Sequence, residues 1–106
     1  LAQLDLGQVD LRQAQLQEAN LLKADLHLAD LRGANLGWAV LVQADLREAK
    51  LQGAQFKDVR LGGAKLLGAD FTGAAMDTLG LQGVNLAGAI WVDGRTCGSG
   101  SFGRCR

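Results

Sequence analysis

Residues 24–33 read Ala-Asp-Leu-His-Leu followed by Ala-Asp-Leu-Arg-Gly, two copies of one five-residue unit. The unit continues in both directions: every fifth residue from Leu6 to Leu86 is Leu, Phe or Met, and the residue two places earlier is usually Ala. On an α-helix, positions five apart are separated by about 140° and would spread around the whole surface. On a straight strand, successive leucines would alternate between faces, because five is odd and the side-chain period is two. The chain must therefore turn a corner after each unit, which predicts a solenoid.

The positions of a unit have different roles. In the first copy, the strand period points Ala24 and Leu26 toward the axis and Asp25 and His27 outward, and the corner swings Leu28 outward. Glycine often stands at this last position, as in Gly33, where a corner suits it. An Asp or Asn before the central residue favours a bond to nearby backbone at a turn. We interpret these residues as structural: Asp5, Asp10, Asn20, Asp25, Asp30, Asn35, Asp45, Asp70 and Asn85.

The tandem Ala-(Asp/Asn)-Leu-X-X units, from about Leu4 to Trp91, resemble the pentapeptide-repeat family. The resemblance implies an all-β fold, a right-handed quadrilateral β-helix with four repeats per coil, so that residues twenty apart stack. Residues 1–92 would form about four and a half such coils. Two inner columns would be Leu6, Leu26, Leu46, Leu66 and Leu86, and Leu11, Leu31, Leu51, Phe71 and Trp91. Two pairs of irregular residues also lie twenty apart, Val59 with Leu79 and Phe56 with Met76.

The overall charge of the chain gives no indication of a partner. Eleven basic and eleven acidic residues balance in the 106-residue sequence. No net field therefore draws the chain toward nucleic acid or an anionic membrane surface. No apolar run approaches the length of a membrane span. We expect neither nucleic acid nor direct membrane insertion.

The repeat stops before a tail, residues 93–106, which we expect to cap the solenoid. Its two cysteines, Cys97 and Cys105, are close together in a glycine-rich loop, which suggests a disulfide. Metal binding is the rival interpretation, but the single histidine, His27, is remote in sequence, so the chain alone lacks a complete zinc ligand set. The tail resembles the ends of short exported bacterial pentapeptide-repeat proteins, which implies an oxidising compartment such as the periplasm.

No arrangement of residues predicts catalysis. His27 falls at an outward position among Asp25, Asp45 and Arg47, which is typical of a solvated charged side. No serine, histidine and acid set and no phosphate-binding glycine fingerprint can be assembled. Outward carboxylates form columns that could bind a cation, but neighbouring arginines offer ordinary compensation. We therefore predict no enzymatic activity, no catalytic residue, no cofactor, no metal and no small-molecule substrate.

Two places stand out as candidate contact surfaces. One is an apolar group formed by Leu22, Val40 and Val42 on the fourth side of the coil and by Trp38 at the corner between its third and fourth sides. A Trp flanked by aliphatic residues favours docking. The other is the N-terminal end, where Leu1 and Leu4 offer apolar cover. At either end of a stack of coils, the backbone N–H and C=O groups of the terminal coil have no further coil to pair with. We expect this end to be covered by a partner, by a second copy or by residues since removed.

These observations favour a non-enzymatic structural or protein-docking module, as an accessory subunit of a larger exported or periplasmic assembly. A protein partner or self-association is expected. The alternative is a DNA-mimicking inhibitor of a topoisomerase such as gyrase, as in the quinolone-resistance members of the family. Those members are strongly acidic and pair through a C-terminal helical module, whereas this chain is neutral and ends in a glycine-rich tail.

Overall fold

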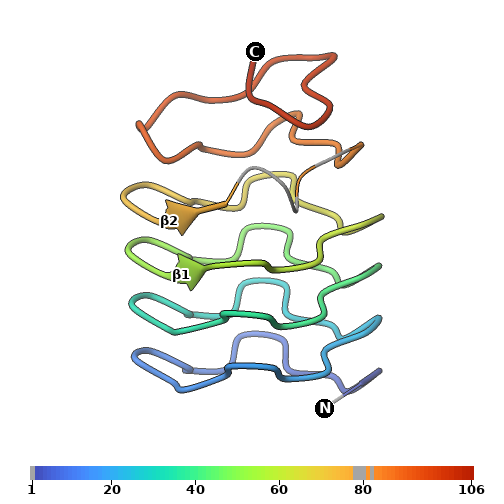
Figure 1. Cartoon of the computed structure of the whole chain (residues 1–106), viewed down its shortest axis with the longest axis vertical. Coiled ribbons are helices and arrows are strands. Elements are labelled where there is room, and N and C mark those ends of the chain that lie inside the picture. Colours follow the sequence, from blue (N-terminus) through green and yellow to red (C-terminus); the bar gives the residue numbers. More distant parts are fainter. Residues whose placement is uncertain (1, 78–80, 82) are drawn as a thin grey trace.

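The computed structural model of the chain describes residues 2–77, 81 and 83–106. The backbone winds in stacked coils around one long axis, with the two termini at opposite ends of the stack (Figure 1). The Cα extents are 31 × 21 × 21 Å. None of the described residues is in an α-helix, and no helix in that part of the chain could cross a membrane.

Backbone pairing joins residues twenty positions apart. The strands β1 (Gln55–Phe56) and β2 (Ala75–Met76) pair in parallel, Gln55 with Ala75 and Phe56 with Met76. Isolated parallel bridges repeat this interval along the chain: Asp5 with Asp25, Asp10 with Asp30, Gln15 with Asn35, and Asn20 with Val40. The stacking of residues twenty apart, predicted from the sequence, is thus confirmed, and the fold is a β-solenoid. Leu79, the predicted counterpart of Val59, lies outside the described residues.

Each corner is a tight turn that begins at the central residue of a unit. The Leu11 carbonyl accepts a hydrogen bond from the Ala14 N–H at 3.0 Å, and the same bond recurs from unit to unit. The third turn residue has a positive φ, as at Gln13 (62°), which is the mark of a type II turn. Glycines such as Gly33 (72°) occupy this position as predicted, but Gln, Glu, Lys, Leu, Trp and Asp residues occupy it too. The left-handed conformation costs such residues only about 1–2 kcal/mol, so glycine is not required.

The Asp and Asn residues before the central positions stabilise these turns. The Asp25 Oδ1 accepts the His27 N–H at 3.1 Å, two residues further along the chain. All the acids and amides assigned a turn role from the sequence make this bond: Asp5, Asp10, Asn20, Asp25, Asp30, Asn35, Asp45, Asp70 and Asn85. Their structural role, predicted from the sequence, is confirmed.

The core consists of the central residues and the alanines of successive coils. Leu26, Leu46 and Leu86 are completely buried, and each such side chain contributes about 1.5–3 kcal/mol before conformational entropy is subtracted. Toward the C-terminal end the core becomes aromatic. The Phe71 ring centroid lies 5.6 Å from that of Phe56 and 5.4 Å from that of Trp91.

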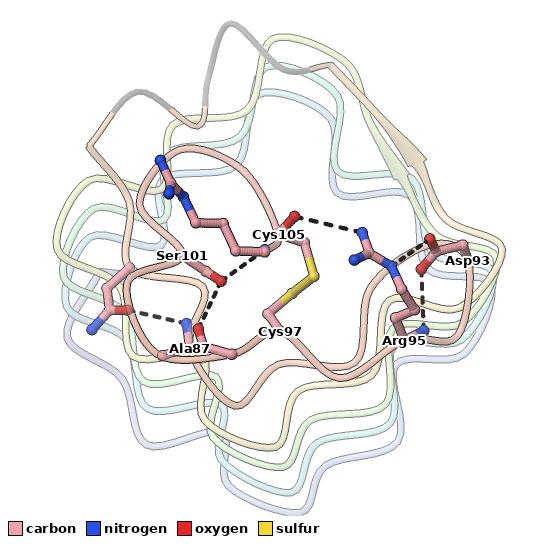
Figure 2. The surroundings of a disulfide bond; sticks show 9 residues. Ala87, Asp93, Arg95, Cys97, Ser101 and Cys105 are labelled. Carbon is pink, nitrogen blue, oxygen red and sulfur yellow. Dashed lines mark hydrogen bonds and ion pairs between the residues drawn. A yellow bond between two sulfur atoms is a disulfide. The ribbon is translucent and has the colours of Figure 1, made fainter.

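The tail closes the C-terminal end by running antiparallel along the last units. Leu86 N–H donates to Ser101 C=O at 2.6 Å, and Gly88 N–H donates to Cys97 C=O at 2.8 Å. A disulfide joins Cys97 to Cys105, with Cα atoms 4.9 Å apart. Figure 2 shows this disulfide lying across the end of the coils. The tail therefore occupies the hydrogen-bonding positions that another coil would use.

Candidate protein-docking surface

Trp38 is the outstanding apolar side chain of the predicted surface. It is the third residue of its turn, with a φ of 57°, and the corner projects its side chain so that half of it (50%) stays exposed. The Lys57 Nζ, from the next coil, lies 5.1 Å from the centroid of the Trp38 ring. The structure thus presents an exposed indole in contact with a cation.

The three aliphatic residues predicted beside Trp38 are less exposed than the indole. Leu22, Val40 and Val42 are all half-buried. Leu22 and Val42 are twenty residues apart, and the Lys23 N–H donates to the Val42 carbonyl at 2.9 Å, which places Leu22 and Val42 in neighbouring coils. The sequence identified the group, but in the structure its apolar exposure is concentrated at Trp38.

At the N-terminal end, the first coil is less covered than the second. Leu6 and Leu11 are half-buried, whereas their counterparts Leu26 and Leu31 are fully buried. Leu4, one of the two residues predicted for a docking end, is 46% exposed. The other, Leu1, lies outside the described residues.

His27 lies in a ladder of ion pairs on a different side. Its Nδ1 is 2.6 Å from the Asp25 Oδ1, and this hydrogen bond is the main reason that the pKa of His27 is raised above 6.5. The charges of Asp45 and Asp5 raise it further. Among the described residues, Asp25, His27 and Asp45 have ligand atoms within 4.8 Å of one another and so could hold a cation. However, Arg47 already binds Asp45 through two hydrogen bonds of 2.9 and 2.6 Å, which favours an ion-pair network over a metal centre.

Asp-Leu-Arg sequences within single units form the same kind of pair. Arg32 donates to both carboxylate oxygens of Asp30, at 2.8 and 2.6 Å, and this pairing lowers the pKa of Asp30 to about 2. Arg12 binds Asp10 in the same way. The carboxylates of Asp10, Asp30 and Asp45 are therefore compensated within their own repeats.

Sequence reasoning did not single out two further exposed leucines. Leu67 is 63% exposed and Leu28 is 43% exposed. Leu67 lines a shallow cavity of about 340 Å³ together with His27, Arg47 and Glu48. The available signal was the presence of leucine at the fourth and fifth positions of a unit, where most units carry polar residues or glycine.

The parallel pairing of residues twenty apart defines a β-solenoid built from five-residue repeats. The family model for pentapeptide repeats (8 copies) matches residues 1–33, 29–66 and 54–90. The chain belongs to the pentapeptide-repeat family, which confirms the resemblance of its units. No curated protein matches it.

Several solved structures resemble the chain. A pentapeptide repeat protein from the Arabidopsis thaliana thylakoid lumen is 26% identical with a TM-score of 0.46, over 83% of this chain and 68% of that one. A pentapeptide repeat protein from Nostoc Pcc 7120 is 34% identical with a TM-score of 0.32, over 67% of each chain. QnrB1, a plasmid-mediated fluoroquinolone resistance protein, is 21% identical with a TM-score of 0.29, over 82% of this chain and 47% of that one.

Proposed function

We propose that this protein is a non-enzymatic docking module, an accessory subunit of a larger exported or periplasmic assembly. The observation that carries the proposal is the exposed indole of Trp38. A half-exposed Trp gains little from core packing, so packing does not account for a Trp at this corner. Exposed aromatic residues are typical of the energetically important centre of protein interfaces.

The coil serves this function as a rigid support. We propose a right-handed quadrilateral solenoid of about four and a half coils over residues 1–92. Two equal transverse extents of 21 Å and the twenty-residue pairing interval support four sides per coil. The disulfide between Cys97 and Cys105 supports an oxidising compartment, because such bonds persist in exported proteins.

The N-terminal end is the second part of this proposal. Its half-buried leucines and the exposed Leu4 support a contact that covers the first coil in the working protein, from a partner, a second copy or further residues of the same polypeptide. Light scattering that shows a stable monomer in the presence of the native extract would argue against a partner and against a second copy.

The docking proposal is tested by charge substitution at the corner. Trp38→Glu should abolish co-purification of the native partner from the compartment in which the protein occurs. Leu28→Glu is the matched control, since Leu28 has a similar φ (60°) and exposure (43%) at another corner. Unchanged co-purification with Trp38→Glu would refute docking through this surface.

The topoisomerase-inhibitor alternative has a separate test. DNA mimicry needs a strongly negative surface, whereas this chain has equal numbers of acidic and basic residues. In addition, Arg12, Arg32 and Arg47 pair with aspartates of their own repeats. We expect no inhibition in a gyrase supercoiling assay. Inhibition at stoichiometric concentrations would favour the alternative.

A further inference from the structure

The corner that carries Trp38 is acidic in the coils on either side. Glu18 and Asp58 are twenty residues before and after Trp38, and all three have a positive φ at the same turn position. The Glu18 N–H donates to the Gly37 carbonyl at 2.8 Å, and the Trp38 N–H donates to the Lys57 carbonyl at 2.7 Å. The indole therefore lies in a short column between two carboxylate-bearing residues.

The indole of Trp38 already makes a cation–π contact within the molecule. The Lys57 Nζ lies 5.1 Å from the ring centroid, inside the range in which the negative face of an aromatic ring attracts a cation. Half of the Trp38 side chain stays exposed with Lys57 in place. The ring is thus accessible to a second molecule, and its surroundings suit a cation.

We propose that the Trp38 corner binds an arginine or lysine side chain from a basic segment of the partner protein. This inference rests on the proposed docking function and specifies the chemistry of the partner. Glu18 and Asp58 supply complementary negative charge at the same corner in the two neighbouring coils, and Lys57 occupies the ring in the absence of the partner. The incoming cation displaces Lys57.

The neighbouring side supplies the rest of the contact. Val40 and Val42 are half-buried and follow Trp38 along the chain, so they offer apolar surface for the methylene stem of the incoming side chain. Arg60 pairs with Val40 across the coils, which places a positive charge on that side. The preferred approach is therefore along the corner column and away from Arg60.

The test uses an acetylated hexapeptide of alternating arginine and glycine, with a matched peptide in which citrulline replaces arginine. Citrulline keeps the shape of the side chain and removes its charge. Binding at low salt is followed by NMR through the indole N–H of Trp38, with Trp91 as an internal reference. We expect the arginine peptide to shift the Trp38 signal in a saturable manner and the citrulline peptide to leave it unchanged.

Variants then distinguish binding of the arginine peptide at Trp38 from nonspecific electrostatic binding to the protein surface. In the variants, binding is followed through the backbone N–H signals of Glu18 and Asp58, because Trp38→Leu removes the indole. Trp38→Leu should weaken binding of the arginine peptide by about two- to fivefold, the effect expected for an exposed cation–π contact. Lys57→Met should strengthen it, because the competing cation is removed. Leu28→Ala should have no effect. Equal binding of the two peptides, or unchanged binding to Trp38→Leu, would overturn the proposal.

The two proposals can fail separately. If Trp38→Glu abolishes co-purification of the partner but the arginine peptide does not bind, docking at this corner stands and the cation-binding proposal is wrong. If the arginine peptide binds at Trp38 but co-purification is unchanged, the cation site stands and the docking function is wrong.

Discussion

Breaking the disulfide should loosen the C-terminal cap and leave the middle of the solenoid folded. The bond joins cysteines eight residues apart, and Cys97 is almost completely buried in the core. In the chain-entropy account, closing a loop of this size contributes about 2.5 kcal/mol at 25 °C. The variant Cys97→Ala/Cys105→Ala should lose stability of this order in urea unfolding.

Hydrogen exchange would locate the loss. The N–H groups of Leu86 and Gly88 donate to carbonyls of the tail, whereas the Leu26 N–H donates to Asp45 in the next coil. Because repeat folds are stabilised mainly by neighbouring units, we expect faster exchange at Leu86 and Gly88 and little change at Leu26.

The control is the parent protein treated with reductant, which should reproduce the exchange pattern of the double variant. Unchanged protection of Leu86 and Gly88 after the bond is broken would contradict this prediction. That result would mean that the antiparallel main-chain bonds and the buried Ser101 hold the tail without the disulfide.

Three further predictions concern the coils themselves. Leu46→Ala should lower the free energy of unfolding, measured by chemical denaturation, by about 2–5 kcal/mol, because the Leu46 side chain is completely buried. Leu11→Ala should lower it clearly less, because Leu11 is half-buried. Equal losses would contradict the difference in burial between the first coil and the inner coils. Gly53→Ala should destabilise by about 1 kcal/mol through its φ of +70° alone, since nothing lies near the new methyl group. Gly62→Ala, equally open but without a positive φ, should be neutral or slightly stabilising, and a similar loss at both sites would refute the backbone explanation. His27 should titrate above pH 6.5 in an NMR titration. Because its pKa is raised in the folded state, its contribution to stability should be fully present below pH 6.5 and lost as the pH rises through the raised value; an NMR pKa at or below 6.5 would contradict this account.

The repeat pattern alone predicts a solenoid and its turn chemistry, whereas the twenty-residue stacking interval came from the resemblance to the pentapeptide-repeat family. The first two features are local and repeated: a five-residue period requires a corner, and the corner determines which position needs a small residue and which a turn-forming acid. For this reason Leu26 could be assigned to the core and Asp25 to a turn from one unit, and both assignments agree with the structure.

Which outward residues are exposed, and what they contact, depends on packing between coils and could not be predicted from the sequence. The exposure of an outward side chain depends on its neighbours one coil away, twenty residues distant in the sequence. Val40 is half-buried by such neighbours, while Leu67, in a similar chemical class, is largely exposed. The contact between Lys57 and Trp38 also joins different coils, so it depends on rotamers that no local pattern specifies. The repeat predicts the positions of side chains around the coil, and packing between coils determines the surface that a partner meets.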